Sequence, residues 1–252
     1  MRYIAILTFA LCSVLAYSEP EAVQVWMSSE DMKQTLTQGA PIPLDVAGKP
    51  GIERVIKVNP AKSYQSTLGM GSSFEHTTCY NLFKLGPEKM SETIGKLVDP
   101  EKGIGMNLMR ICIGTPDFTG EPWYSYDDMP EGQTDPKLEH FTIDKDRAYV
   151  LPVLKKALEV NPGLLFFASP WSPPGWMKTT KDMIGGHLES RWYSVYAKYF
   201  VKFIQAYAAE GIPIHAVTIQ NEPGVNTRDY PTSEWYPSCQ WAVLEDPDTF
   251  GP

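Results

Sequence analysis

The sequence predicts an α/β fold in which helices cover a parallel sheet. From about residue 64 onward, apolar strand-like segments alternate with amphipathic helical segments, and four such strands can be distinguished. Repeated strand–helix units imply a parallel sheet with covered faces. In each unit the polar and aromatic residues gather just after the strand, which is the functional edge of a (β/α)8 barrel. This barrel is therefore the predicted architecture.

The alternative architecture is an open, doubly wound sheet, which the same alternation of strands and helices would also produce. Such folds commonly bind phosphate groups through a glycine-rich turn after the first strand. The first predicted strand is not followed by a turn of the GxGxxG or GxxxxGK type. The sequence thus favours the barrel over the open sheet.

The predicted strands and helices alternate along the chain from about residue 64. Strands are expected at 68–74, 106–114, 164–168 and 214–219. Helical stretches are expected from the end of the first strand to residue 97, and again at 145–160 and 192–210. Long polar and aromatic loops are expected at 115–141 and 169–186. Only about the first four strand–helix units of a barrel can be recognised.

The first 18 residues have the pattern of an export signal. Arg2 provides the positive start, residues 4–15 form an apolar run, and Ala16 and Ser18 are the small residues that a signal peptidase reads. A buried first helix is the alternative. The apolar run is shorter than the roughly 20 residues that span a membrane, and no later segment is long and apolar enough to do so. We therefore expect an exported protein without an integral membrane segment.

Residues 19–63 differ from the rest of the chain. They contain strand-like stretches at 23–26 and 54–58, separated by a segment with several glycines and prolines, which is typical of strands joined by loops. The domain boundaries predicted are therefore 1–18 for the signal, 19–63 for these N-terminal strands and 64–252 for an incomplete barrel.

Composition excludes some functions. The chain has 30 acidic and 22 basic residues, which argues against nucleic-acid binding because such proteins carry clustered basic charge. Three cysteines remain after the signal, so at most one internal disulfide can form. No Cys/His spacing indicates a metal site, and no organic cofactor is predicted. Aromatic residues make up 12% of the chain, which suits a sugar-binding cleft or an ordinary core.

The most specific local motif is Asn221-Glu222-Pro223, directly after the last predicted strand. A glycosidase needs a carboxylic acid that protonates the leaving sugar oxygen and later deprotonates water. Burial and a neighbouring carboxylate would raise the pKa of such a group toward the working pH. Asn221 could bond the 2-hydroxyl of the sugar, a contact that strengthens in the transition state. The motif alone could also be an ordinary turn; its place after a strand favours the catalytic interpretation.

Longer motifs give a family resemblance. The chain resembles glycoside hydrolase family 30, the glucosylceramidase group, over roughly residues 23–241. The matching stretches are the glycine turn at 69–71, GIGMNLMRICIGTPDFT at 103–119, ASPWSPPGWMKT at 168–179, YAKYFVKFIQAYAAEGI at 196–212 and AVTIQNEPG at 216–224. The resemblance implies a (β/α)8 TIM barrel with a small side β-domain, to which residues 19–63 would contribute.

The resemblance also implies roles for five residues. Glu222 matches the acid/base residue, and Asn221 the residue on the 2-hydroxyl. Asp117 matches a carboxylate that binds sugar hydroxyls, and Trp171 an indole that lines the glucose subsite. Arg110 matches a strand arginine that acts on the catalytic pair through its field. The competing interpretations are loop capping for Asp117, core packing for Trp171 and a plain buried ion pair for Arg110.

The chain departs from the family pattern in two places. Its first glycine turn continues into Glu75 and His76, for which the resemblance implies no role. The family's nucleophile lies on the seventh strand, and no residue here matches it.

We therefore expect a truncated enzyme, inactive in isolation, that by family would hydrolyse glucosylceramide or a related β-glucoside with retention. Its substrate would lie in solution or at a membrane surface. The alternative is a noncatalytic remnant that at most binds sugar; xyloside, fucoside and β-1,6-glucan specificities and the oligomeric state stay open.

Overall fold

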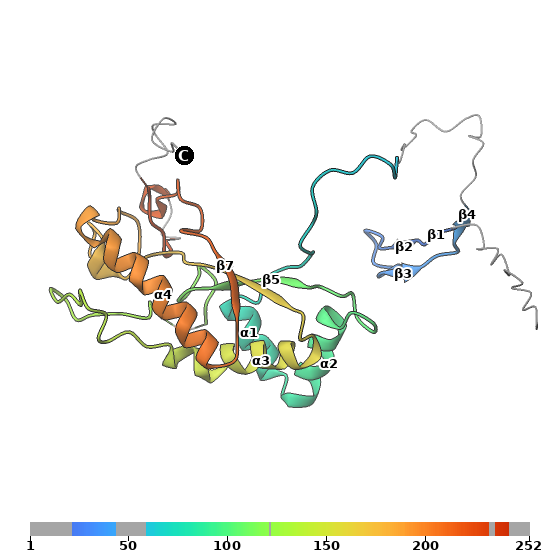
Figure 1. Ribbon diagram of the computed structural model, residues 1–252, viewed down its shortest axis with the longest axis horizontal. Helices are drawn as coiled ribbons and strands as arrows, with labels where there is room; N and C mark the ends of the chain where they lie inside the picture. Colours follow the sequence, from blue (N-terminus) through green and yellow to red (C-terminus); the bar gives the residue numbers. More distant parts are fainter. Residues whose placement is uncertain (1–21, 44–58, 121, 232–234, 242–252) are drawn as a thin grey trace, which may run out of the picture. The chain divides into compact units, whose positions relative to one another are not determined.

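The computed structural model describes residues 22–43, 59–120, 122–231 and 235–241 (Figure 1). The chain divides into two compact units, Met1–Tyr64 and Gln65–Pro252, and each is described by itself. The predicted export signal at 1–18 and the predicted strand at 54–58 lie outside the described residues. No helix within the described ranges is long and apolar enough to cross a membrane.

The first unit consists of short antiparallel pairings. Strand β1 (Ala22–Val23) pairs with β4 (Ile42–Pro43), and β2 (Trp26–Met27) pairs with β3 (Thr37–Gln38). The single strand predicted at 23–26 is thus two strands with different partners. Their side chains are exposed, so this unit has no core of its own among the described residues.

The second unit is built on a parallel sheet. Strands β5 (Leu108–Cys112), β6 (Leu165–Ser169) and β7 (Ile214–Val217) lie side by side in chain order, all parallel. Consecutive order is that of a barrel wall, because a doubly wound sheet reverses its strand order at the switch point. The predicted strands at 106–114, 164–168 and 214–219 differ from these bounds by at most two residues at either end.

The strand predicted at 68–74 is reduced to one bridge, Ser73 to Arg110, beside β5. The backbone nevertheless follows β5 closely: Phe74 N donates to Arg110 O at 2.8 Å, and Arg110 N donates to Ser72 O at 2.9 Å. A Cβ atom on Gly71 would lie 1.7 Å from the Leu108 carbonyl oxygen. Glycine is therefore required there, because any side chain would push the two backbones apart.

Helices lie to one side of the parallel sheet (Figure 1). They are α1 (His76–Lys84), α2 (Pro87–Val98), α3 (Val150–Val160) and α4 (Tyr193–Ala209). Each buries one apolar stripe, as the 3.6-residue period requires. The helix predicted at 145–160 is instead a 3-10 turn, η1 (Asp144–Ala148), followed by α3. Shorter 3-10 turns occur at η2 (Gly175–Met177), η3 (Ser190–Trp192) and η4 (Thr227–Asp229).

A buried carboxylate sits in the core beneath the helices. Asp146 of η1 accepts hydrogen bonds from the hydroxyls of Tyr124 at 2.5 Å, Tyr126 at 2.6 Å and Tyr207 at 2.5 Å. Burial raises the pKa of Asp146, and the three hydroxyl donors oppose that shift. The network ties the loop after β5 to η1 and to α4, so it fixes how α4 packs on the domain.

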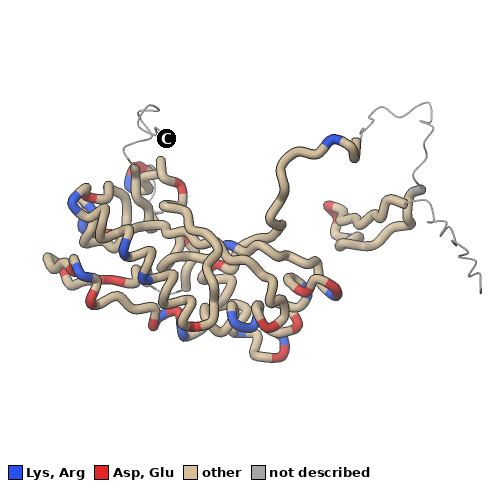
Figure 2. Tube along the Cα trace, in the orientation of Figure 1, with Lys and Arg blue, Asp and Glu red and all other residues tan. Residues whose placement is uncertain are grey.

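The cysteines and the surface charges complete the fold. Cys79, Cys112 and Cys239 are buried free thiols, so the described cysteines form no disulfide. Cys112, on β5, is buried in the core with 8% of its surface exposed. Lysines and arginines interleave with acidic residues along the second unit (Figure 2).

Candidate active site

The carboxyl ends of the parallel strands bring three of the predicted site residues together. The Arg110 guanidinium on β5 donates from Nη2 to the Asn221 side-chain oxygen at 2.6 Å, just after β7. Its central carbon lies 4.4 Å from the centre of the Trp171 ring, which follows β6. Residues from three successive strand ends therefore share one contact cluster, as the functional edge of a barrel requires.

Arg110 has a third neighbour at this edge. Its Nη1 lies 3.9 Å from Oε1 of Glu75, and each side chain is about a quarter exposed (25% and 24%). The ion pair considered for Arg110 exists, but it is partly exposed rather than buried. The same guanidinium also orients Asn221 and stacks on Trp171, so its role exceeds that of an isolated ion pair.

Trp171 is buried, with 4% of its surface exposed. Its indole packs under the guanidinium, and its carbonyl accepts a 2.6 Å hydrogen bond from the Gln220 side chain. Gln220 Nε2 also lies 2.9 Å from the Asn221 carbonyl oxygen. The segment after β6 and the segment after β7 are thereby locked to each other through Gln220.

Glu222 occupies an unusual backbone conformation. Its φ is 48°, in the left-handed region that residues other than glycine rarely adopt. The preceding amide, Asn221 N, donates to Pro170 O at 2.7 Å and anchors the turn. Such conformations cost about 1–3 kcal/mol and persist where the surrounding structure enforces them, commonly at functional sites. Glu222 was expected to be buried; its side chain is exposed here, because β7 has only β6 as a neighbour among the described strands.

Tyr236 approaches Glu222 from a later segment. Its hydroxyl donates to Glu222 Oε2 at 3.4 Å and lies 3.3 Å from the Tyr230 hydroxyl. Burial, then the Tyr230 contact and the charges of Glu222 and Asp117, raises the pKa of Tyr236 well above its usual value. Tyr236 therefore remains a protonated donor toward the Glu222 carboxylate at every physiological pH.

Asp117 lies after β5 and is partly exposed. It makes no hydrogen bond or ion pair with other described residues, so the structure does not give it the loop-capping contact considered from sequence. It follows the carboxyl end of β5, and its charge contributes to the raised pKa of Tyr236. A free carboxylate there is available to accept hydrogen bonds from sugar hydroxyls. Across the described residues, no three His, Cys, Asp or Glu side chains cluster to hold a metal ion.

Comparison with known proteins gives the family. Residues 67–232 match the Glycosyl hydrolase family 30 TIM-barrel domain. The chain belongs to this family. Its fold is accordingly a TIM-barrel domain, of which the structure describes a partial sheet of parallel strands. The resemblance noted from the sequence motifs is confirmed.

Three relatives show the range of the family. An endo-1,6-beta-D-glucanase of Neurospora crassa is 33% identical over 84% of this chain and 45% of its own length. The lysosomal acid glucosylceramidase of Mus musculus is 30% identical over 70% of this chain and 35% of its own. A solved endo-β-1,6-glucanase shares 33% identity and a TM-score of 0.68, over 81% of this chain and 43% of that one. The chain thus spans less than half the length of these relatives.

Sequence reasoning missed two residues that the structure brings to this edge. Tyr236 stands in a segment with no recognised motif, so nothing in the sequence pointed to it. Lys178 lies inside the ASPWSPPGWMKT motif, but a lysine in a loop is normally expected to be exposed to solvent. Its complete burial was the signal, and burial is visible only in the structure.

Proposed function

We propose that this chain carries the acid/base part of the active site of a retaining β-glycosidase. Glu222 is the acid/base residue, Asn221 bonds the sugar 2-hydroxyl, and Asp117 and Trp171 bind the sugar. Arg110 orients Asn221 and adds positive potential beside the reacting carboxylates. The single observation that carries the proposal is the Arg110–Asn221–Trp171 cluster, which assembles next to Glu222 at the ends of three parallel strands.

The chemistry follows from what these groups can do. Glu222 protonates the departing glycosidic oxygen in the first step and deprotonates water in the second. Asn221 is held by a short charge-assisted hydrogen bond from Arg110, which leaves its amide nitrogen free to donate to the substrate. The reaction needs a second carboxylate about 5 Å from the first as nucleophile. We propose that this group comes from a part of the barrel beyond the four recognised strand–helix units.

We propose a β-glucoside as the substrate, with glucosylceramide as the leading candidate. The glucosylceramide proposal rests on the group that the sequence motifs resemble and on the similarity to a lysosomal acid glucosylceramidase. A β-1,6-glucan is the second candidate, favoured by two relatives of higher identity that are named endo-1,6-glucanases. Both substrates present a β-linked glucose to the acid/base residue. They differ in the leaving group, and an internal glucose of the glucan also carries the preceding sugar on its 6-hydroxyl. We also propose that the protein is exported, as its first 18 residues predict.

The test is cleavage by the purified chain with sodium azide added, because azide can attack the anomeric carbon in place of the nucleophilic carboxylate that no residue of this chain matches. A fluorogenic β-glucoside, glucosylceramide in detergent micelles and a β-1,6-glucan are each incubated with wild type and with Glu222→Gln. We expect the variant to lose about a hundredfold or more of any turnover, because it cannot exchange the proton. Glu92→Gln, an exposed carboxylate on α2, is the matched control and should keep full activity.

Other outcomes decide against parts of the proposal. Turnover that survives in Glu222→Gln would remove Glu222 from the acid/base role. A wild-type chain that binds β-glucosides without cleaving them would support the noncatalytic sugar-binding remnant instead. The preferred polymer or lipid among the three substrates would decide between the two substrate classes.

A further inference from the structure

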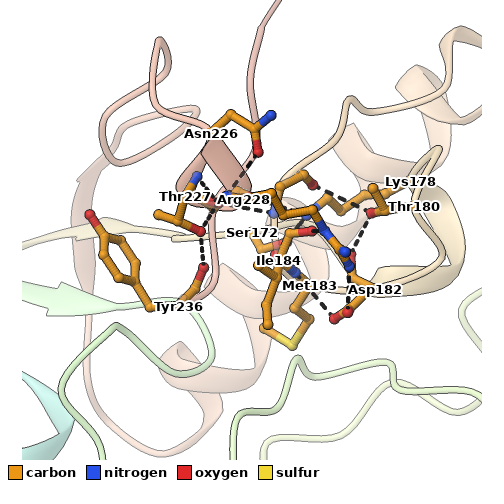
Figure 3. A network of polar contacts seen from close by, with 12 residues as sticks. Ser172, Lys178, Thr180, Asp182, Met183, Ile184, Asn226, Thr227, Arg228 and Tyr236 are labelled. Atoms are coloured by element: carbon orange, nitrogen blue, oxygen red, sulfur yellow. Dashed lines mark hydrogen bonds and ion pairs between the residues drawn. The ribbon is translucent and has the colours of Figure 1, made fainter. Parts of the chain in front are cut away.

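Lys178 is a fully buried lysine at the centre of a polar network (Figure 3). Its ammonium donates to Ser172 Oγ at 2.9 Å, to Met183 O at 2.6 Å and to Ser238 O at 2.6 Å. All three N–H bonds of the ammonium are therefore used. Two of the acceptor segments also bond each other directly, since Ser238 N donates to Met183 O at 3.0 Å. Lys178 reinforces that contact and ties both segments to Ser172.

The charge of Lys178 is balanced by dipoles alone. It has no ion pair among the described residues, and burial lowers its pKa to about 8. Of the charged groups around it, the Asp182 carboxylate opposes this shift and the Arg228 guanidinium adds to it. The nearby Cys239 is a buried thiol whose pKa burial raises. Burying an unpaired ammonium is costly, and a methionine of similar length would fill the same space without that cost. A role beyond packing accounts for a lysine here.

The segments that Lys178 joins lead to the candidate active site. Ser172 directly follows Trp171. Ser238 lies two residues after Tyr236, whose hydroxyl donates to Glu222. Thr227 links Tyr236 and Ser238: its Oγ1 donates to the Tyr236 carbonyl at 2.8 Å and lies 2.9 Å from Ser238 Oγ. Figure 3 shows Lys178, Thr227 and Tyr236 within one connected set of polar contacts.

We propose that Lys178 is a positioning residue, whose ammonium fixes the 236–238 segment so that the Tyr236 hydroxyl stays on Glu222. The inference rests on the proposed acid/base role of Glu222. With Tyr236 on Oε2, Glu222 keeps its other oxygen, Oε1, to carry the proton that is transferred. Loss of Lys178 would release Ser238 and Met183 together and let Tyr236 swing away. Glu222 would then lose its orientation but keep its charge.

The test uses the leaving group of the substrate. The dinitrophenolate leaving group of dinitrophenyl β-glucoside departs without a proton. The methoxide of methyl β-glucoside must be protonated as it departs, so only its cleavage depends on the acid. With azide again supplied as the nucleophile, we expect kcat/KM of Lys178→Met on the methyl glucoside to fall at least tenfold more than its kcat/KM on the dinitrophenyl glucoside. A general structural defect would lower both equally, and an equal loss would overturn the proposal.

A double variant tests whether Lys178 acts through Tyr236. Tyr236→Phe removes only the hydroxyl and should give the same leaving-group-selective loss. Lys178→Met in that background should then add no further selectivity, because the two residues act on one contact. Independent selective losses that multiply would contradict the route through Tyr236. Lys202→Met is the matched control, since Lys202 also donates to a backbone carbonyl, that of Leu138 at 2.6 Å, away from Glu222.

A second measurement keeps the two proposals separable. Hydrogen exchange of the full chain reports on the 183–185 and 236–240 amides whether or not the chain turns over substrate. In Lys178→Met these amides should exchange at least tenfold faster while those of α1–α3 stay unchanged. Unchanged exchange at 236–240 would overturn the positioning role. Absence of wild-type turnover, with the expected exchange pattern, would count against the glycosidase proposal alone.

Discussion

Asp146 and Lys178 are both withdrawn from solvent, with 1% and 0% of their surfaces exposed. Asp146 is an anion with three hydroxyl donors, and Lys178 is a cation with three oxygen acceptors. Neither has a charged partner within ion-pair distance among the described residues. Each buried charge is therefore stabilised by neutral hydrogen-bonding groups, hydroxyl donors for the anion and oxygen acceptors for the cation.

The difference lies in what each charge connects. The partners of Asp146 are tyrosines, and the network joins the loop after β5 to η1 and to the helix α4. The partners of Lys178 are two backbone carbonyls and a serine, all in loops at the carboxyl ends of the strands. Substitution can remove the side-chain partners of Asp146 one at a time, whereas the backbone carbonyls that Lys178 bonds are present whatever the residue. We infer that Asp146 secures the fold and Lys178 secures the shape of loops that carry chemistry.

The largest effect on stability is expected from Asp146→Ala. Three buried hydroxyls lose their common acceptor at once, so the free energy of unfolding should fall by about 3–5 kcal/mol. Urea denaturation followed by tryptophan fluorescence measures it. Asp144→Ala, on the same 3-10 turn but exposed, is the control and should change little. A fall of less than about 1 kcal/mol would mean that the tyrosines find other partners.

The next effect concerns how stability depends on pH. The pKa of Lys178 is about 8 in the folded protein against 10.5 when unfolded. Between these values the unfolded chain binds more protons, so this group makes stability rise with pH, by up to about 3 kcal/mol. Lys178→Met should lack that rise. Denaturation midpoints across pH 8–10.5 compare the two proteins, and identical slopes would show that Lys178 titrates normally.

The smallest effect is expected from Ser172→Ala. It removes one of the three acceptors of Lys178 and leaves the two carbonyls in place. The free energy of unfolding should fall by about 1 kcal/mol, the usual value of one hydrogen bond. Thermal unfolding detects it. A loss as large as that of Asp146→Ala would show that the cation depends on its side-chain partner, and the contrast with the carbonyls would be wrong.

Much of the second unit could be predicted from sequence. The apolar runs that became β5, β6 and β7 and the amphipathic stretch of α4 are set by hydrophobic periodicity, which burial on a packed domain imposes. The strand expected at 68–74 was largely wrong, because glycines there serve close backbone approach and form only one bridge. The single helix expected at 145–160 is divided at Tyr149 into η1 and α3, and the hydrophobic periodicity does not predict this division.

The candidate site was predicted in its residues but not in its contacts. Motif resemblance selected Arg110, Trp171, Asn221 and Glu222, and the sheet order brings them to one edge. The stacking of Arg110 on Trp171 and its bond to Asn221 depend on tertiary packing, which no local pattern encodes. Tyr236 and Lys178 were not predicted from the sequence for the same reason, because their positions depend on how separate loops pack against one another.

The left-handed backbone of Glu222 has a consequence for protein engineering. Glycine or asparagine would suit a φ of 48° better than glutamate does. A library of variants screened for heat resistance alone would therefore be drawn to this position and would discard the carboxylate. Under the proposed acid/base role of Glu222, selection of that kind would stabilise the domain and remove its activity in the same step, so a thermostability campaign should hold residue 222 fixed.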